Sequence, residues 1–345
     1  MKKTIAKERS GQNIALIGCG AIAERYYLPA LARHPMLLQN LVLVDRDQNR
    51  LEMLSKSFQI KNTNCDYREV MHEIDGAIIA LPTGMHASIG IDFLSNGIPI
   101  LCEKPLAENF YNAHQMVVAA KKYEVGLAVN YLQRVVPHFA RVKELLESNT
   151  WGAPLYIDYV VGEIFNWPTV SGFYFKENRS SRGILRDRGA HAVDHICWWL
   201  GCKPEVVSSF NDSFGGSEAV ARIDFMHGGC VGQLTLSWFA DVPCRFVINC
   251  EKATLEGDIY DYQHLKIIQN GETKVISMNS PLISKIDVAE QIVLNFYKVI
   301  NKEKPPLVSG EDVLASIEFI DECYKVAKPF HMPWYEITEN QNVIK

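Results

Sequence analysis

The first part of the chain alternates short apolar runs with longer segments whose apolar residues recur at helical spacing. Runs that are apolar throughout are typical of strands buried on both faces of a parallel sheet. Such strands, separated by helices, imply right-handed crossovers. The predicted strands are Ile14–Ile17, Leu41–Asp45, Asp75–Leu81, Ile98–Cys102 and Gly126–Asn130. Four helices are predicted between these strands. The first ends near His34 and the second spans Arg46–Phe58. The third runs from a Thr83 cap to Asn96, and the fourth from an Asn109 cap to about Lys122.

The rest of the chain has a different pattern, in which apolar and polar residues partly alternate. Alternation with close turns predicts strands that pair antiparallel, and Asn270-Gly271 is a strong tight-turn signal. The strands predicted here are Leu155–Phe165, Ala219–Phe225, Val231–Phe239, Arg245–Cys250, Leu265–Ile268 and Lys274–Met278. Two amphipathic helices, Ile286–Ile300 and Glu311–Val326, follow them. The chain is therefore predicted to be an α/β protein with a doubly wound parallel sheet followed by an α+β domain.

Composition narrows the class of protein. The chain has 345 residues, 48% of them hydrophobic and 22% charged, which is ordinary for a globular protein of two domains. A net charge of -5 gives no general attraction to nucleic acid or anionic lipid, and no apolar run is long enough to span a bilayer. The nine cysteines include no CxxC pair, so we interpret them as reduced thiols. We expect a cytoplasmic protein with no nucleic-acid or membrane partner.

The segment Asn13–Leu31 (NIALIGCGAIAERYYLPAL) fits two interpretations. Leu16–Cys19, preceded by a basic start, resembles a bacterial lipoprotein cleavage box. The same residues also predict a strand that runs into a Gly18-x-Gly20-x-x-Ala23 turn, which would be a dinucleotide-binding loop. Cleavage before Cys19 would remove the first strand of an otherwise intact domain, so the second interpretation is favoured.

In that setting each residue of the loop has a mechanical role. Gly18 permits a tight turn, Gly20 lets the backbone approach a pyrophosphate, and Ala23 lets the next helix, whose N-terminus favours phosphate charge, pack close to the strand. Ala21 and Ile22 of the loop are also expected to bind the cofactor. Asp45 ends the second strand, where a carboxylate accepts hydrogen bonds from a ribose 2′-hydroxyl. This predicts NAD as the cofactor. Arg46 beside it could hold a 2′-phosphate, so NADP is not excluded.

Four motifs together resemble the Gfo/Idh/MocA oxidoreductase family. They are the strand end Leu101–Leu106 (LCEKPL), the preceding Pro82 with His86, Gly183–Asp194 (GILRDRGAHAVD), and Asn130–Pro137 (NYLQRVVP). The resemblance covers nearly the whole chain. It implies a Rossmann domain over residues 1–131 and, over residues 132–345, a substrate-binding and dimerisation domain with a large, open, mostly antiparallel sheet. It also implies a homodimer or homotetramer.

The resemblance assigns catalytic positions to Lys104, Asp187 and His191. Our own interpretation of the roles is His191 as acid/base, Lys104 as its electrostatic partner and Asp187 as substrate orienter, with an exchange of the Lys104 and His191 roles left open. The residue types agree, because an imidazole titrates near neutral pH and an ammonium at the carboxyl end of a strand can polarise a reacting oxygen. The cofactor-binding residues expected beyond the glycine loop are Asp45, Arg46, Leu81, Pro82, Thr83, His86, Glu103, Lys104 and Arg134.

Several polar residues keep a second interpretation. Arg134 could contact nicotinamide or substrate, or be a plain salt-bridge partner. Asp194 and His195 could brace a helix. With His191 they could also be metal ligands, but no further well-spaced ligand appears and we predict no metal site. The arginines of the segment 178–188 could select an anionic substrate, or pair with acids elsewhere.

The leading hypothesis is an NAD(P)-dependent dehydrogenase. It would transfer a hydride between nicotinamide and a secondary hydroxyl of a sugar, polyol or sugar derivative, which could be anionic or nucleotide-linked. A redox-neutral glycoside hydrolase that keeps NAD bound is an alternative, as the resemblance allows such enzymes. A non-catalytic NAD-binding sensor is the third, although it would not need Lys104, Asp187 and His191.

Overall fold

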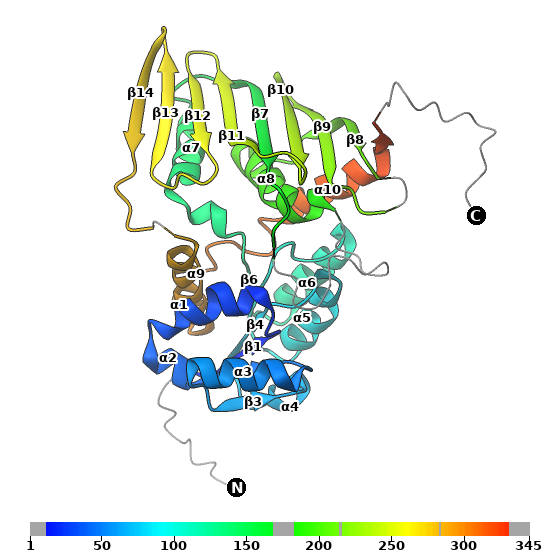
Figure 1. Cartoon of the computed structure of the whole chain (residues 1–345), viewed down its shortest axis with the longest axis vertical. Coiled ribbons are helices and arrows are strands. Elements are labelled where there is room, and N and C mark those ends of the chain that lie inside the picture. Colours follow the sequence, from blue (N-terminus) through cyan, green and yellow to red (C-terminus); the bar gives the residue numbers. More distant parts are fainter. Residues whose placement is uncertain (1–11, 168–182, 214–215, 283, 331–345) are drawn as a thin grey trace, which may run out of the picture.

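The computed structural model describes residues 12–167, 183–213, 216–282 and 284–330. It contains two sheets, each packed against its own helices, with the first sheet below the second in Figure 1. The six-stranded first sheet has the order β3-β2-β1-β4-β5-β6 and is parallel throughout. Its strands are β1 (Ile14–Ile17), β2 (Leu41–Val44), β3 (Asn62–Asn64), β4 (Gly76–Ile79), β5 (Ile100–Cys102) and β6 (Leu127–Val129).

The helices of the first domain begin where local signals place them, with one exception. Asp47 caps α3 (Gln48–Phe58), and Asn109 caps α6 (Phe110–Lys122), as predicted for Asn109. Thr83, however, is not a helix cap. It lies inside a 3₁₀ turn, η2 (Thr83–Met85), because the Met85 amide already bonds to the Pro82 carbonyl oxygen. The remaining elements are η1 (Ala23–Tyr27), α1 (Leu28–Ala32), α2 (Pro35–Gln39), α4 (Tyr67–Val70) and α5 (His86–Ser95).

The second sheet has nine strands in the order β14-β13-β12-β11-β7-β10-β9-β8-β15. It is mostly antiparallel, as predicted; β10 pairs parallel with β7, and β15 with β8. Its strands are β7 (Pro154–Gly162), β8 (Glu205–Asn211), β9 (Val220–His227), β10 (Cys230–Ser237), β11 (Val242–Cys250), β12 (Thr254–Asp258), β13 (His264–Gln269), β14 (Glu272–Ser277) and β15 (Lys328–Pro329). Asn270 and Gly271, both with positive φ, form the predicted tight turn between β13 and β14.

Helices α7 (Pro137–Glu147), α8 (Ile184–Leu200) and α10 (Leu314–Val326) belong to the second domain, and Figure 1 shows α8 and α10 against one face of its sheet. A short 3₁₀ turn, η3 (Leu132–Val135), leads into α7. Among the described residues, no helix combines the length and apolarity needed to cross a membrane.

The helix α9 (Lys285–Ile300) lies apart from the other late helices, beside α1 of the first domain (Figure 1). Arg33 Nη1 lies 2.8 Å from Asp287 Oδ1, and His34 Nε2 lies 2.6 Å from Glu290 Oε1. After α9, the Val308 carbonyl oxygen accepts from the Val129 amide at 2.9 Å, at the edge of the first sheet. The late part of the chain therefore returns to the first domain. The division predicted at residue 131 stays a prediction.

The core of the second domain contains an aromatic cluster with two buried histidines. His138 stacks on Phe246 at 5.9 Å between ring centroids, and His195 stacks on Trp199 at 5.2 Å. Burial lowers the pKa of His138 from 6.5 to about 4, against the opposing charge of Asp261. The ring is therefore neutral in the folded protein at neutral pH.

We expect this histidine to make the protein acid-sensitive. Its folded-state pKa lies below its unfolded value, so the unfolded chain binds the proton more readily. Its contribution to the free energy of unfolding is complete above pH 6.5 and falls as the pH drops toward 4, by about 3 kcal/mol in all. Urea unfolding at several pH values should show a shallower acid loss for His138→Phe than for wild type. The exposed His72→Phe serves as control, and parallel curves for wild type and His138→Phe would refute the assignment.

Candidate active site

The glycine loop follows β1 directly. Gly18 has φ +97°, and a Cβ on it would lie 2.5 Å from the Ala80 carbonyl oxygen. A Cβ on Gly20 would meet nothing within 4 Å, so the space beside Gly20 is open. A helix begins at Ala21 and Ile22, and the first amides of a helix have no partner within it. The loop therefore fits a phosphate group, as the dinucleotide-binding interpretation expects.

The two glycines should respond differently to substitution. Gly18→Ala forces a strained φ and a clash with backbone, so we expect it to lower the free energy of unfolding by about 2 kcal/mol or more. Gly20→Ala should leave stability near wild type yet weaken NAD binding, because its methyl group fills the open space. Thermal unfolding without NAD and calorimetric NAD titration measure both effects. Equal destabilisation by the two variants, or wild-type NAD affinity in Gly20→Ala, would contradict this.

Asp45 lies beside the loop at the end of β2. Its Oδ2 accepts from the Cys19 amide at 2.7 Å, and its Oδ1 accepts from the Asp47 amide at 2.9 Å. These bonds hold the carboxylate against the glycine loop, where the predicted ribose contact requires it. Arg46 is exposed. Arg50, which sequence reasoning did not single out, donates from Nε and Nη2 to the Cys19 carbonyl oxygen at 2.9 and 2.7 Å and so ties α3 to the loop.

The segment Leu81–His86 connects the cofactor side of the site to the predicted catalytic lysine. His86 is fully buried, with its ring nitrogens 2.8 Å from the Leu81 carbonyl oxygen and 3.0 Å from that of Pro105. The Lys104–Pro105 peptide bond is cis. Burial lowers the pKa of His86, against the raising effect of these backbone oxygens, and the ring packs between Leu81 and Pro105.

Lys104 follows β5 and reaches across to α8. Its Nζ lies 3.0 Å from Asp187 Oδ1 and donates to the Asp187 backbone carbonyl oxygen, also at 3.0 Å. Both side chains are less than one-fifth exposed. The structure therefore brings two of the three predicted catalytic residues into one ion pair, with the ammonium held at a fixed place by two oxygens of the same residue.

Glu103, one residue earlier, is buried in a polar network next to Lys104. Its Oε1 accepts from the Tyr27 hydroxyl at 2.8 Å and from Asn130 Nδ2 at 2.6 Å, and its Oε2 accepts from the Lys104 amide at 3.1 Å. Burial raises the pKa of Glu103, against the lowering effect of these donors. The network fixes the backbone of Lys104 through its amide, which gives Glu103 a positioning role.

His191 lies one helical turn after Asp187 on α8, as the spacing predicted. Its Nδ1 is enclosed and has no hydrogen-bond partner among the described residues, so Asp187 pairs with Lys104 and does not orient the imidazole. Burial, and then the charge of Lys104, lower the pKa of His191 well below 6.5. The ring is therefore neutral at physiological pH and able to accept a proton.

Asp194, Arg134 and His195 take structural contacts. Arg134 donates from Nε and Nη2 to the two Asp194 oxygens at 2.7 and 2.8 Å, and its guanidinium lies over the Trp198 ring. The Tyr159 hydroxyl lies 2.8 Å from His195 Nδ1. The salt-bridge and bracing interpretations describe these contacts, and a contact of Arg134 with the cofactor stays a prediction. No group of three or more potential metal ligands occurs in the part of the chain that is described.

Comparisons with known proteins agree with this arrangement. A model of the oxidoreductase family with an NAD-binding Rossmann fold matches residues 12–131, and a model of the GFO/IDH/MocA C-terminal domain matches residues 139–256. The chain belongs to the Gfo/Idh/MocA family. It is thus an NAD(P)-binding oxidoreductase, and its first domain is an NAD-binding Rossmann domain.

Individual relatives are distant. The rhizopine catabolism protein MocA of Rhizobium meliloti is 26% identical over 233 residues, which cover 65% of this chain and 70% of the relative. The 3-ketoreductase KijD10 of Actinomadura kijaniata, solved with NADP and TDP-benzene, has a TM-score of 0.80 at 18% identity and covers 93% of this chain and 99% of its own. Levoglucosan dehydrogenase, solved with NADH and levoglucosan, has a TM-score of 0.79 at 18% identity, with coverages of 91% and 96%. These solved structures show that the fold is shared.

Within this Gfo/Idh/MocA fold, the start of α8 is held by a residue that the sequence did not reveal. Glu218, which precedes β9, accepts from the Ile184 amide through its backbone oxygen at 2.9 Å and from the Leu185 amide through Oε1 at 3.1 Å. The Tyr324 hydroxyl donates to the same Oε1 at 2.6 Å. A carboxylate at a helix N-terminus is stabilising, so Glu218 fixes the turn of α8 that carries Asp187.

The arginines of the segment 178–188 divide into two groups. Arg179 and Arg182 lie outside the described residues. Arg188 Nη2 lies 2.7 Å from Glu163 Oε2, and Arg186 Nη2 lies 3.5 Å from Asp321 Oδ1. Both described arginines thus pair with acids, which was the second interpretation of this segment.

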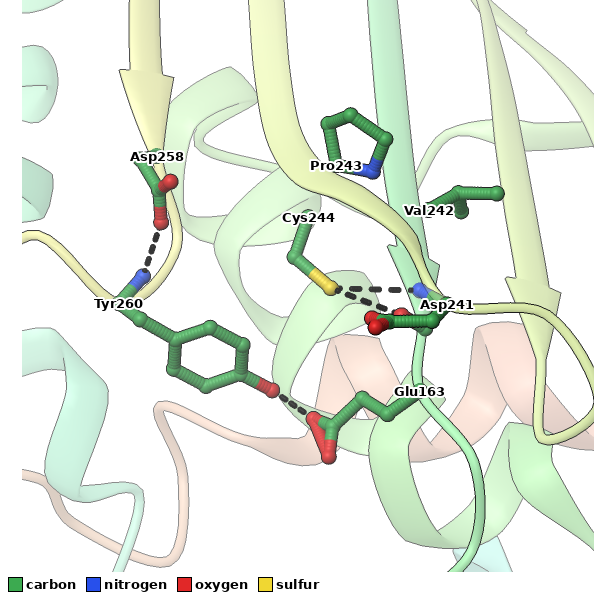
Figure 2. Close-up of a pocket in the computed structure, with 8 residues that line it drawn as sticks. Glu163, Asp241, Val242, Pro243, Cys244, Asp258 and Tyr260 are labelled. Atoms are coloured by element: carbon green, nitrogen blue, oxygen red, sulfur yellow. Dashed lines mark hydrogen bonds between the residues drawn. The ribbon is translucent and has the colours of Figure 1, made fainter.

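A cavity of about 440 Å³ lies beside Glu163, where β7 and β12 end and β11 begins. Figure 2 shows the Tyr260 hydroxyl turned toward the Glu163 carboxylate, to which it donates a hydrogen bond. The lining residues are Gly162, Glu163, Asp241, Val242, Pro243, Cys244, Asp258 and Tyr260. No sequence signal marked this cavity, because its walls join the end of β7 to two strands, β11 and β12, that follow about 80 residues later in the chain.

Proposed function

We propose that this chain is an NAD-dependent dehydrogenase that transfers a hydride between nicotinamide and a secondary hydroxyl of a sugar, polyol or sugar derivative. The observation that carries the proposal is the Lys104–Asp187 ion pair with His191 on the next turn of α8, at the carboxyl end of β5. In open parallel sheets ligands bind at this end of the strands. The relative crystallised with NADH and levoglucosan supports a sugar-like substrate.

The residues suit the proton and charge requirements of alcohol oxidation. When bound, NAD accepts the hydride from the alcohol carbon. His191 is neutral, and its Nε2, the ring nitrogen that is not enclosed, accepts the hydroxyl proton. The Lys104 ammonium donates a hydrogen bond to the same oxygen and stabilises the negative charge that develops there. Asp187 keeps the ammonium in place, and in the reverse reaction His191 returns the proton.

Asp45 supports NAD as the preferred dinucleotide. Its carboxylate is fixed beside Cys19 of the glycine loop, where it would accept from a ribose hydroxyl and repel a 2′-phosphate. The homodimer or homotetramer expected from the resemblance stays a prediction, which light scattering of the purified protein would test.

The direct test is nicotinamide absorbance, with purified protein and NAD against polyols, sugars, sugar acids and nucleotide sugars. We expect a steady rise with members of one class. No rise with any class, in protein that calorimetry shows to bind NAD, would overturn the proposal. Release of an aglycone without net NAD reduction would then identify the redox-neutral hydrolase, and absence of both reactions would favour the sensor.

A further inference from the structure

The first residue of α9, Lys285, carries a cation into the proposed site. Ser284 and Asp287 form a capping box around it, which fixes the start of the helix. The Lys285 Nζ lies 5.7 Å from the centroid of the Tyr260 ring, whose hydroxyl donates to Glu163. Figure 2 shows this Tyr260–Glu163 contact at the rim of the cavity. Lys285 therefore lies beside the residues that connect the cavity to α8.

The charges around Lys285 are unequally matched. Lys104 is paired with Asp187, and Arg188 is paired with Glu163, so each of these two cations has its own carboxylate. Lys285 has no carboxylate within ion-pair distance among the described residues. A cation in the first turn of a helix is also unfavourable for the helix dipole. Within the described part of the chain, Lys285 is thus the cation of this group that has no carboxylate at ion-pair distance.

Burial supports the same conclusion. Loss of solvent around Lys285, and then the positive charge of Arg188, lower the pKa of its ammonium. Glu163 opposes this shift, and Lys104 adds to it. A partly buried ammonium in such surroundings gains from a negatively charged partner, because it has lost part of its water and has no carboxylate at ion-pair distance among the described residues.

We propose that Lys285 binds an anionic group, a carboxylate or a phosphate, on the substrate of this site, and this inference rests on the proposed function. The cavity lining includes Asp241 and Asp258, which would repel an anion, so the anion is expected at Lys285 itself. The carboxylates of the cavity suit hydroxyl groups, which donate to them. The favoured substrate is therefore a polyhydroxylated acid or phosphate ester, and not a neutral sugar. In this proposal Lys285, and not the arginines of the segment 178–188, selects the anionic substrate.

The experiment compares D-glucose, D-glucuronate, D-gluconate and D-glucose 6-phosphate, with NAD, on wild type and three variants. Lys285→Met removes the charge, Lys285→Arg keeps it, and Lys298→Met removes an exposed lysine of the same helix. We expect wild type to favour an anionic compound over glucose in kcat/KM. Lys285→Met should lose about 10- to 100-fold of that preference, mainly through KM, as expected for one charge-assisted hydrogen bond. Lys285→Arg should keep most of the preference, and Lys298→Met all of it.

Comparing kcat/KM for D-glucuronate and D-gluconate with kcat/KM for D-glucose 6-phosphate identifies whether a carboxylate or a phosphate is recognised. An unchanged preference in Lys285→Met, with wild-type thermal stability, would overturn the inference while leaving the dehydrogenase proposal intact. If no compound is oxidised, calorimetric binding of the same compounds to the NAD-loaded protein decides separately. Binding of an anion that is lost in Lys285→Met upholds the inference, and equal binding by wild type and Lys285→Met refutes it.

Discussion

Replacing Lys104 by methionine should lower kcat by about 10²- to 10³-fold while NAD still binds, because the variant loses the ammonium that stabilises charge on the reacting oxygen. Methionine keeps most of the side-chain length, and the Glu103 contact to the residue 104 amide does not need the ammonium. Steady-state turnover of the substrate found in the absorbance test, with NAD affinity from calorimetry, measures both quantities. Lys56→Met, an exposed lysine on α3, is the matched control. Wild-type turnover in Lys104→Met would show that the site is elsewhere.

His191→Ala separates the roles that the sequence left open. If His191 accepts the proton, kcat/KM of wild type should fall only at acid pH, below the ordinary imidazole value of 6.5, because burial and Lys104 lower the pKa of His191. This acid limb should disappear in His191→Ala together with most of the activity. An acid limb that persists in His191→Ala would show that a group other than His191 accepts the proton.

Removing Asp194 should destabilise the protein by about 3–5 kcal/mol, the usual result of leaving one partner of a buried ion pair without its counter-charge. Arg134 is 9% exposed and Asp194 1% exposed, so Asp194→Ala leaves a guanidinium that is largely shielded from water and has lost its counter-charge. Urea unfolding of the NAD-free protein, followed by tryptophan fluorescence, suits this measurement because Trp198 lies under Arg134. The expected change is a lower midpoint for the second domain.

An exposed pair on α7 provides the control for this prediction. Arg141 and Glu144 are three residues apart and largely solvated, so Glu144→Ala should cost less than about 1 kcal/mol. The double variant Arg134→Met/Asp194→Leu should recover much of the loss, because no buried charge is left unpaired. A loss below about 1 kcal/mol in Asp194→Ala would mean that water reaches Arg134 in solution.

Strands of the first domain could be predicted from the sequence where burial requires a run of apolar residues. Every strand from β1 to β6 except β3 is a run of buried apolar residues, so the pattern predicts it. The strand β3 is Asn-Thr-Asn at the sheet edge, and it was missed because an exposed edge strand has no apolar signature. In the second sheet, β8, β12 and β15 were missed. The parallel pairing of β10 with β7 joins segments that no local turn connects.

The candidate site was predicted in part for the same reason. Asp187 and His191 are recognised from their spacing on one helix, and Lys104 from its place after a buried strand. The ion pair between Lys104 and Asp187 was not predicted, because these two residues are 83 apart in the chain. Glu218 and Lys285 carry no motif around them, and only the packing of β9 and α9 brings them to the start of α8 and to the Tyr260 ring.

The sequence by itself determined the order of the buried strands and longer helices of the first domain, the glycine loop and the Asn109 helix cap. These features follow from neighbouring residues, so a single segment contains the information. The tertiary structure decided which charges pair and where α9 lies. It also decided that Lys285 has no carboxylate at ion-pair distance among the described residues. Those outcomes depend on distances between segments far apart in the chain, and they are set by the packing of two sheets and their helices against each other.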